Sequence, residues 1–575
     1  MIAERRRIGD ILIARGLITQ RQLEDALDLQ RLTPAPLDSI LTHLGFVEEE
    51  ALVDALASEY GVKPWNLRVN PPDPRAVAKL PGDVARSYKV LPVGISGETL
   101  FLAMADTEDI EALDLVRYQT RMKVEPVLTA RHRLLQTIRD LHGGDVAGAG
   151  NELGNLATQA ALNVKPRSAQ TQVDDPSVDS APVVGLVTQI FQDAIKAGAS
   201  DIHIEPTATK IELRYRIDGR MRKMSELPAS LLQALTIRIK ILAELDISEH
   251  RLPMDGRIGM SFEDRKVDLR LSVVPSHHGP RMVIRILDQV RGLKQLNELG
   301  LSRENLKLFR HLITRPYGMF LVTGPTGSGK TTTLYAALIE VRDASINVIT
   351  VEDPIEYEID GVSQSQINES IGVTFDRQII ALMRQDPDVI LVGEIRDEPT
   401  AQAAVRGALT GHLMLSTLQC NDAPSAIPRL MELGIDPYLL STSLAGLSAQ
   451  RLVRMLCLHC KTTRPITPEE EHIFGVYGVQ APRVMPLQEG CPECGHVGFK
   501  GRNALHEILP VTNEVSQLIA SRASVEMLRA AAGKAGYVPM QHRALELVVK
   551  GATTFEEAQR VVAFDPDYGI FLGHG

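Results

Sequence analysis

The sequence predicts a multidomain α/β protein whose largest domain is built on a parallel sheet. Its 575 residues are too many for a single hydrophobic core, so about three or four domains are expected. Between about residues 290 and 450, apolar strands alternate with helical patterns, which is typical of a parallel sheet covered by helices. One of these strands, MFLVT, leads into a glycine-rich loop and then a helix.

The N-terminal part contains an internal repeat over residues 5–62, with an offset of 29 residues. Gly16 aligns with Gly45, and each copy predicts a short helix, a turn at this glycine and a second amphipathic helix. Residues 66–142 mix apolar strands, VLPVGI and TLFLAMAD, with helices, which predicts a compact α/β subdomain. We expect residues 1–142 to form one N-terminal docking domain.

A change in composition separates this domain from the rest of the chain. Residues 143–181 are rich in Gly, Ala, Ser and Asp, which predicts a flexible linker. A helix and the strands DIHIEP, KIELRYRIDG, KVDLRLSVVP and RMVIRIL follow, so residues 182–288 are expected to form an α+β domain. Residues 289–575 are expected to form the parallel-sheet domain with C-terminal helices and an insert at 457–494.

Composition and charge exclude several classes of protein. A net charge of -10 opposes a protein that mainly grips nucleic acid, and no series of base-stacking aromatic residues is present in the sequence. Asp10 and Arg15 interrupt the apolar stretch that a signal peptide needs, and no run approaches the roughly 18 apolar residues of a membrane span. Four of the five cysteines stand in C-x-x-C pairs, which indicates a reducing compartment. We therefore expect a cytoplasmic protein.

The glycine-rich loop has the complete spacing of a phosphate-binding loop, G-x-x-x-x-G-K-T. Backbone N–H groups of such a loop curl around phosphates, its lysine neutralises the β and γ oxygens, and its threonine hydroxyl binds Mg²⁺. The predicted ATP-binding residues here are Gly324, Pro325, Thr326, Gly327, Ser328, Gly329, Lys330, Thr331 and Thr332. A chance match is disfavoured because a strand precedes the loop and a helix follows it.

Two further strands end in carboxylates at the edge where parallel sheets bind ligands. Glu352 and Asp353 follow NVITV, and Glu394 follows VILVG, with Gly393 where many such ATPases carry an aspartate. One carboxylate is expected to hold the Mg²⁺ shell and another to orient the attacking water. We favour Glu352 as the base and Glu394, with Thr331, as the Mg²⁺-binding pair. The alternative is that each acid merely ends a strand.

The paired cysteines predict a structural zinc site. Cys457-Leu-His-Cys460 and Cys491-Pro-Glu-Cys494 each form a C-x-x-C knuckle. Four thiolates close a tetrahedral Zn²⁺ site with no open position, so this metal is not expected to do chemistry. Four unconnected thiols are the alternative that the spacing disfavours.

Five motifs in order resemble the secretion ATPase superfamily: GPTGSGKTTTLY, VEDPIEY, RQDPDVILVGEIRD, TGHLMLSTL and LSAQRLVRMLC. Within it the chain most resembles the type II secretion ATPases, known as general secretory pathway proteins E. Type IV pilus assembly ATPases are their closest relatives. The resemblance covers nearly the whole chain. It implies a RecA-like ATPase domain, a PAS-like domain before it, a zinc-binding insert and a homo-hexamer that uses ATP and Mg²⁺.

The same resemblance implies specific residues and partners. Arginines of the preceding domain are expected to reach the phosphates, and the matching positions are Arg214, Arg216, Arg257 and Arg270. A solvated strand-edge arginine is the alternative for any single one. The motor is expected to act on inner-membrane secretion-platform proteins through residues 1–142, driving pseudopilus assembly and the export of folded proteins across the outer membrane.

The stretch LTGHLMLSTLQCND departs from the family pattern. Family members usually carry two histidines, at the places held here by His412 and Gln419. Glutamine keeps a donor and an acceptor but cannot take up a proton, so we expect Gln419 to sense the nucleotide as a neutral group. Cys420 follows an apolar run and is expected to act as a small buried hydrophobe rather than in redox chemistry.

Several functional alternatives remain open at this stage. The repeat resembles modules that bind cyclic di-GMP, and copy one fits with Arg7, Gly9 and Gln30. Copy two carries Asp38 and Glu59 at the matching places, which is electrostatically wrong for a bis-anionic ligand, so a docking module is favoured. Beside the secretion motor stand a pilus assembly ATPase, a nucleic-acid-translocating ATPase and a low-turnover nucleotide-binding scaffold.

Overall fold

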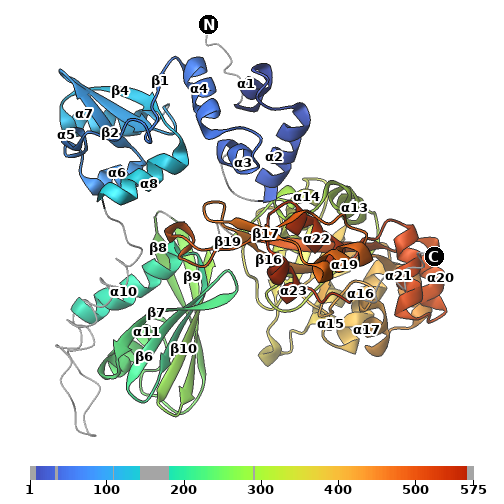
Figure 1. Cartoon of the computed structure of the whole chain (residues 1–575). Helices are drawn as coiled ribbons and strands as arrows, with labels where there is room; N and C mark the ends of the chain where they lie inside the picture. Colours follow the sequence, from blue (N-terminus) through green and yellow to red (C-terminus); the bar gives the residue numbers. More distant parts are fainter. Residues whose placement is uncertain are drawn as a thin grey trace. The chain divides into compact units, whose positions relative to one another are not determined.

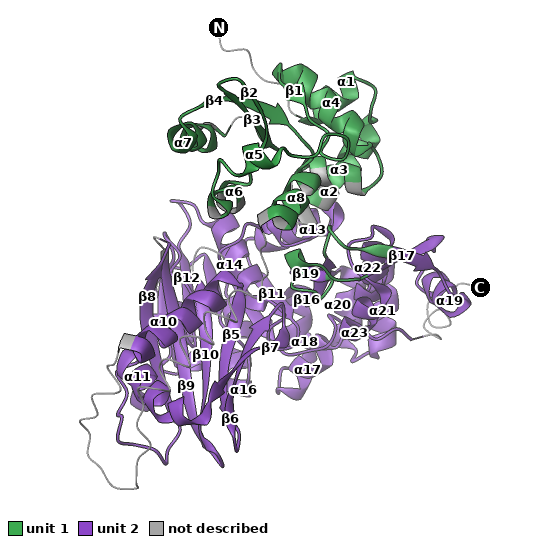
Figure 2. Ribbon diagram, turned by 60° about the vertical axis from the view of Figure 1, so that its left-hand side comes forward, with its two compact units in different colours: residues 1–147, 457–462, 488–498 green, residues 148–456, 463–487, 499–575 purple. Residues whose placement is uncertain are grey.

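The computed structural model describes residues 8–32, 37–107, 109–142, 181–263, 265–288 and 292–565. The chain forms two compact units (Figure 2). Unit 1 comprises residues 1–147, 457–462 and 488–498, and unit 2 comprises residues 148–456, 463–487 and 499–575. Arg7 and all but the last residue of the expected linker 143–181 lie outside the described residues.

The N-terminal repeat forms four helices: α1 (Ile8–Ala14), α2 (Gln20–Leu32), α3 (Leu37–His43) and α4 (Glu49–Tyr60). Gly16 and Gly45 have φ angles of 69° and 67°, in the left-handed region that favours glycine, so both predicted turns are confirmed. Gly9 packs closely against α2, because a Cβ placed on it would lie 2.6 Å from a methyl carbon of Leu23.

The remainder of the N-terminal part is an α/β subdomain with the sheet order β1-β4-β3-β2. Strands β2 and β3 pair antiparallel, whereas β4 pairs parallel with both β1 and β3. The elements are β1 (Lys63–Pro64), α5 (Pro74–Val77), α6 (Gly82–Tyr88), β2 (Leu91–Ser96), β3 (Thr99–Met104), α7 (Ile110–Thr120), β4 (Lys123–Leu128) and α8 (Arg131–His142).

Residues 181–288 form an antiparallel sheet with the order β7-β6-β5-β10-β9-β8. Two helices cover one face, since α10 contacts β5 and α11 contacts β8 and β10 (Figure 1). Four of these strands match the sequence prediction; β7 and β8 were missed because they alternate exposed polar residues with few apolar ones. The elements are α10 (Ala181–Lys196), β5 (Ala199–Pro206), β6 (Lys210–Ile217), β7 (Arg220–Pro228), a 3-10 turn (Ala229–Leu231), α11 (Leu232–Leu242), β8 (Met254–Phe262), β9 (Arg265–Ser276) and β10 (Gly279–Asp288).

The following sheet has the order β13-β12-β14-β15-β11-β16-β19. All pairs are parallel except β16 with β19, so the fully parallel sheet that the sequence suggested becomes mixed at one edge. Its elements to residue 456 are η2 (Leu296–Glu298), α13 (Arg303–Ile313), β11 (Gly318–Thr323), α14 (Lys330–Val341), β12 (Val348–Glu352), β13 (Ser363–Gln366), η3 (Glu369–Ile371), α15 (Phe375–Leu382), β14 (Val389–Val392), α16 (Glu398–Leu409), β15 (Leu413–Leu418), α17 (Ala426–Glu432), α18 (Pro437–Ser443) and β16 (Leu444–Leu456).

Helices pack on both faces of this sheet because its central strands are apolar on both sides. Phe320 and Val322 of β11 share a core with residues of α13 and α14. On the opposite face, Met414 of β15 lies against Gly407 of α16, where a Cβ would approach its sulfur to 2.7 Å. The carboxyl ends of β11, β12, β14 and β15 are thereby held at one edge.

The C-terminal part adds an antiparallel strand and helices to the same sheet. Helices α13 and α22 contact β19, and α23 contacts β16. The elements are β17 (Thr462–Pro465), α19 (Pro468–Val476), β18 (Val484–Leu487), η4 (Pro492–Cys494), β19 (Phe499–Pro510), α20 (Asn513–Ala520), α21 (Val525–Lys534), α22 (Met540–Val549) and α23 (Phe555–Val561). Across the part of the chain that the structure describes, no helix is long and apolar enough to cross a membrane.

Candidate functional site

The phosphate-binding loop joins the buried strand β11 to helix α14. Gly324, Gly327 and Gly329 have φ angles of 147°, 75° and 90°, conformations that L side chains rarely adopt. A Cβ on Gly324 would also lie 2.6 Å from the carbonyl oxygen of Gln450 on β16. The Gln450 side-chain amide donates to the Ser328 carbonyl at 2.7 Å, so a side chain of β16 holds the loop in place. Sequence reasoning missed Gln450, although it lies in the motif LSAQRLVRMLC.

Lys330 begins α14 and folds back over the loop. Its Nζ donates to the carbonyl oxygens of Gly324 at 2.9 Å and Pro325 at 3.2 Å. Burial lowers the pKa of Lys330, and the charge of the nearby Glu394 opposes that shift. Thr331 is exposed in the first turn of the helix. The loop thus presents an ammonium group and a hydroxyl, the groups that a nucleotide with Mg²⁺ requires.

The two strand-end glutamates have different surroundings. Glu352, at the end of β12, is 3% exposed and accepts hydrogen bonds from the Thr350 hydroxyl at 2.6 Å, the Gln364 amide at 3.1 Å and the Tyr335 hydroxyl. Glu394, just past β14, is half-buried and pairs with Arg396. Both lie at the edge that carries the phosphate loop, because β12, β14, β15 and β11 run parallel.

Close approach of the two acid-bearing segments depends on Gly393. A Cβ placed there would lie 3.3 Å from the Cα of Glu352 and 3.4 Å from the carbonyl oxygen of Val351. Asp353, which follows Glu352, is exposed and lies 3.7 Å from the Arg396 guanidinium. Gly393, which stands where many such ATPases carry an aspartate, therefore allows the two loops to lie in contact.

Strand β15 separates the two residues that sequence analysis assigned to the nucleotide. Gln419 follows the carboxyl end of β15, at the edge of the phosphate loop, and is exposed. His412 precedes the strand, and its Nδ1 lies 3.0 Å from the Gly407 carbonyl and 3.1 Å from the Thr410 hydroxyl. Six residues of strand span about 20 Å. The structure therefore does not bring His412 to the phosphate loop of its own chain.

Cys420 is half-buried beside the loop that follows β15. Its thiol lies 3.9 Å from the Ser425 carbonyl. Burial raises the pKa of Cys420 to about 11, which disfavours the thiolate that redox chemistry needs. The structure thus places Cys420 as a packing residue next to Gln419.

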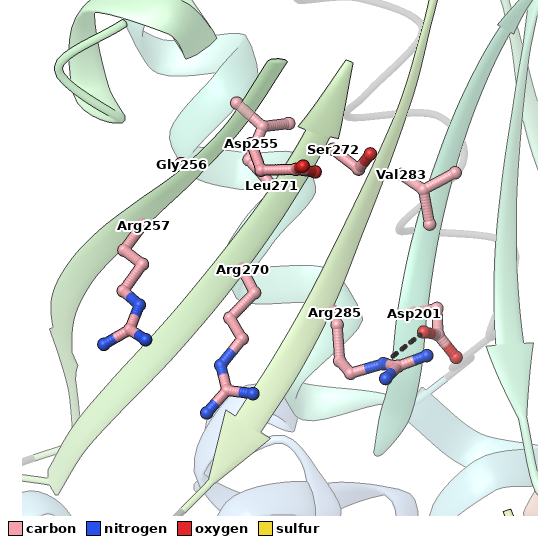
Figure 3. Close-up of a pocket in the computed structure, with 9 residues that line it drawn as sticks. All are labelled: Asp201, Asp255, Gly256, Arg257, Arg270, Leu271, Ser272, Val283 and Arg285. Carbon is pink, nitrogen blue, oxygen red and sulfur yellow. Dashed lines mark hydrogen bonds and ion pairs between the residues drawn. The ribbon is translucent and has the colours of Figure 1, made fainter. Parts of the chain in front are cut away.

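A row of charged side chains crosses the open face of the six-stranded sheet (Figure 3). Arg216, Asp201, Arg285, Arg270 and Arg257 lie directly opposite one another on β6, β5, β10, β9 and β8. Asp201 lies 3.2 Å from Arg285 and 3.6 Å from Arg216, whereas Figure 3 shows Arg257 and Arg270 without a dashed contact between the residues drawn. All members of this row except Arg216 line a cavity of about 480 Å³.

Sequence analysis found three of the four arginines in this row and missed Arg285. Arg285 lies on the same side of the strand RMVIRIL as Arg281 and Val283. Only the antiparallel register shows that it lies between Asp201 and Arg270. Arg214, also predicted, lies two positions before Arg216 on β6, in the next row of the same face, and pairs with Glu205 instead. The structure therefore separates Arg214 from the other predicted arginines.

Arg270 connects this face to the sheet edge that carries the phosphate loop. Its guanidinium donates to the Ile355 carbonyl at 2.9 Å and lies 3.2 Å from the Glu356 carboxylate. Both residues belong to the loop directly after Glu352. The arginine row and the phosphate-binding edge are thus in contact within unit 2.

The four paired cysteines converge in unit 1. Their sulfur atoms lie within 4.8 Å of one another, with Cys457 3.8 Å from Cys491 and Cys460 3.8 Å from Cys494. Four thiolates at the usual Zn–S distance occupy corners about 3.8 Å apart in a tetrahedron. Burial raises the pKa of the Cys457 thiol and raises that of Cys460 to about 11. The geometry fits a structural zinc ion.

Comparison with known proteins identifies the family. Residues 176–560 match the model described as type II/IV secretion system protein, and residues 60–148 match the MshEN domain model. The first match covers more than half of the chain. The chain belongs to the type II/IV secretion system protein family. As a member of this family it is an ATP-hydrolysing motor.

Two relatives show how far this secretion ATPase resembles each branch of the family. It is 38% identical over 559 residues to the type IV pilus assembly ATPase PilB of Myxococcus xanthus, covering 96% of this chain and 98% of that protein. It is 45% identical over 385 residues to the type II secretion system ATPase E of Vibrio cholerae, covering 67% of this chain and 76% of that protein.

A solved structure supports the fold of the secretion ATPase core. The Legionella pneumophila ATPase DotB superimposes with a TM-score of 0.50 at 19% identity, covering 69% of this chain and 98% of that chain. At this identity the likeness concerns the fold. The predicted resemblance to type II secretion ATPases, with pilus assembly ATPases as relatives, is confirmed by the family match and the sequence relatives.

Proposed function

We propose that this secretion ATPase is the hexameric motor of a type II secretion system, hydrolysing ATP to drive pseudopilus assembly and the export of folded proteins across the outer membrane. The observation that carries the proposal is the contact between the arginine row and the loop after Glu352. This contact joins the phosphate-loop edge of one domain to the arginine row of the preceding domain, as a motor that couples hydrolysis to domain movement requires. The 45% identity over 385 residues to a type II secretion system ATPase supports this branch.

ATP is proposed to bind along the loop from Gly324 to Thr332. Lys330 neutralises the β and γ oxygens, and Thr331 with Glu394 holds Mg²⁺. Glu394 suits that role because it lies close enough to Lys330 for their charges to interact. Glu352 is proposed as the base that orients the attacking water. Gln419 is proposed as a neutral sensor of the γ-phosphate. His412 is not proposed to contact the phosphates of the nucleotide that its own chain binds.

The arginines are proposed to act as a group that stabilises charge on the transferred phosphoryl group. The candidates in one row of this face are Arg216, Arg257, Arg270 and Arg285. Asp201 pairs with two of them, Arg285 at 3.2 Å and Arg216 at 3.6 Å. Arg214 is retained as a weaker candidate because Glu205 engages it. Assembly into a hexamer is proposed to hold this group against the nucleotide.

Domain roles follow the division expected from the sequence. We propose that residues 182–288, a PAS-like domain, supply the arginines, and that residues 289–575, a RecA-like domain, hydrolyse ATP. Cys457, Cys460, Cys491 and Cys494 are proposed to bind one zinc ion that stabilises the insert 457–494, since their sulfur spacing matches a tetrahedral site. Residues 143–181 are proposed to link the N-terminal domain to the motor.

The N-terminal domain, residues 1–142, is proposed to dock on inner-membrane platform proteins and so hold a cytoplasmic motor at that membrane. Cyclic di-GMP is the disfavoured alternative for the repeat. Asp38 and Glu59 place two carboxylates at a site for a bis-anionic ligand, and they pair with Arg131 at 3.6 Å and Arg15 at 3.8 Å. The net charge of -10 also disfavours nucleic acid as the partner.

A second candidate is assembly of a type IV pilus. It is favoured by the pilus ATPase PilB relative, whose similarity extends over 96% of this chain, including the N-terminal region. Both candidates require the same ATPase chemistry. They differ in the membrane partner and in the fibre that is built.

Complementation in a strain lacking this gene separates the two candidates. Wild type, Lys330→Ala and the exposed-lysine control Lys307→Ala are introduced, and secreted enzyme activity and surface pili are measured. We expect wild type and the control to restore secretion, and Lys330→Ala to fail. Restoration of pili without any change in secretion would instead establish the second candidate, and no effect on either would refute both.

A further inference from the structure

Tyr335 lies where three parts of the ATPase site meet. It is carried by α14, the helix that begins with Lys330, and its side chain is 1% exposed. Its hydroxyl donates to the Glu352 carboxylate and accepts a hydrogen bond from the Glu356 backbone N–H at 3.2 Å. A phenol offers one donor and can accept, so this pair of contacts uses both capacities.

The contacts distinguish the two oxygens of Glu352. Oε1 accepts from the Thr350 hydroxyl and from the Gln364 amide, whereas Oε2 accepts from Tyr335. A carboxylate oxygen has two lone pairs, so the two donors saturate Oε1. Oε2 is left with one acceptor position beyond Tyr335 among the contacts of the described residues. The oxygen that can take a further partner is therefore the one that Tyr335 holds.

The same network extends to the arginine row. Glu356 donates its backbone N–H to Tyr335 and pairs through its carboxylate with Arg270 at 3.2 Å. The neighbouring Ile355 carbonyl accepts from Arg270 at 2.9 Å. One phenol thus connects the helix of the phosphate loop, the acid at the end of β12 and an arginine of the preceding domain.

Packing restrains the Tyr335 ring. Its ring meets the Tyr357 ring edge-on, with centroids 6.2 Å apart and an interplanar angle of 77°. Tyr357 is itself held by the backbone at Gly292, where a Cβ would lie 2.3 Å from its ring. Burial raises the pKa of Tyr335, so the hydroxyl keeps the proton that it donates.

We infer that Tyr335 is a positioning residue for Glu352, aligning the carboxylate oxygen that receives a water proton and tying that alignment to the loop contacted by Arg270. The inference rests on the proposed role of Glu352 as base. It predicts that loss of the phenolic oxygen slows hydrolysis without weakening nucleotide binding, because the Tyr335 hydroxyl bonds to Glu352 and Glu356, which lie outside the phosphate loop.

Tyr335→Phe in the full-length chain tests this, with Tyr357→Phe as the matched control that removes the same atom from the adjoining ring. Steady-state ATPase rates, affinity for a fluorescent ATP analogue and thermal midpoints are measured for both. We expect Tyr335→Phe to lower kcat about tenfold, the size of one lost hydrogen bond to a charged group, with KM and analogue affinity within about twofold. Tyr357→Phe should retain the wild-type rate.

The Glu352→Gln background separates failure of this inference from failure of the proposed function. If Tyr335 acts through Glu352, adding Tyr335→Phe to Glu352→Gln should cause no further loss. A wild-type rate for Tyr335→Phe, a loss of analogue affinity, or an equal loss in both backgrounds would overturn the inference alone. A wild-type rate for Glu352→Gln itself would overturn the base assignment on which it rests.

Discussion

The two large sheets of unit 2 present their functional side chains in different ways. The seven-stranded sheet uses its edge, where Glu352 ends a parallel strand and Lys330, Glu394 and Gln419 lie in or after the segments that follow such strands. The six-stranded sheet uses its face, where charged residues of five strands stand in one row. At the edge, each functional side chain occupies its own position and has no duplicate. On the face, several arginines lie next to one another and share the positive charge. Loss of an edge residue should therefore cost more than loss of a face residue.

Lys330→Ala should produce the largest effect, because this ammonium group, which lies over the loop carbonyls, is the one proposed to neutralise the phosphates. We expect ATP hydrolysis to fall by about a thousandfold, the scale of removing a preorganised charge from a transition state. Phosphate release by the purified chain measures this. Lys307→Ala, on the exposed side of α13, is the matched control, and a near-wild-type rate for Lys330→Ala would contradict the importance of the edge.

Glu394→Gln should cost about a hundredfold, since an amide oxygen binds Mg²⁺ more weakly than a carboxylate does. Raising the Mg²⁺ concentration should recover part of the rate. The titration of rate against Mg²⁺ checks this prediction. Glu398→Gln, on the exposed first turn of α16, is the control, and an unchanged Mg²⁺ dependence in Glu394→Gln would show that Glu394 does not hold the metal.

Single substitutions on the face should cost less. Arg257→Ala and Arg285→Ala are each expected to lower kcat about tenfold, because neighbouring arginines of the row remain. The double variant should lose more than either single variant. Arg220→Ala, on the outer strand β7, controls for general loss of positive charge. A loss from Arg285→Ala as large as that from Lys330→Ala would erase the distinction between edge and face.

The four-cysteine cluster belongs to neither sheet and should affect stability rather than rate. We expect about one zinc per chain, from a single four-thiolate site. Cys491→Ser should release the metal and lower the thermal midpoint by several degrees, while the ATPase rate of the folded fraction stays within about twofold of wild type. Metal analysis, calorimetry and rate assays check this. Abolished hydrolysis in a folded Cys491→Ser protein would assign the cluster a catalytic role.

Gln419→His should have the smallest effect at the edge. Both side chains offer a donor at this exposed position, so a rate change of about twofold is expected. Cys420→Ser should leave both the rate and the zinc content unchanged, because the thiol is a half-buried packing group. Parallel rate and zinc measurements on the two variants check this. An inactive parent that Gln419→His restores would show that the histidine is required.

The difference between edge and face also explains which residues sequence analysis found. Edge residues occur in contiguous motifs, because a strand, its terminal residue and the next loop are adjacent in the chain. Face residues such as Asp201 and Arg285 are 84 positions apart, and pairing of strands brings them to 3.2 Å. Arg285 was missed, and Arg214 and Arg216 appeared equivalent, because the amino-acid sequence alone does not give the register in which the strands pair.

The strand-end residues show a second limit of sequence reasoning. His412 and Gln419 flank one short strand and occupy a single motif, yet they lie at opposite ends of β15. Glu352 and Glu394 appear equivalent as acids after apolar runs. The structure distinguishes them, because Tyr335 and Gln364 enclose the first while the second pairs with the half-exposed Arg396.

The sequence by itself determined the local chemistry of this protein: the glycines and lysine of the phosphate loop, the acids at the strand ends, the two cysteine knuckles and the helical repeat. Each depends on residues within a few positions, where backbone geometry links sequence directly to structure. Tertiary structure alone decided the arginine row, the antiparallel strand β19 at the edge of the sheet, and the enclosure of Glu352 by Tyr335. These depend on strand register and packing between distant segments, which the burial of apolar side chains determines over the whole fold.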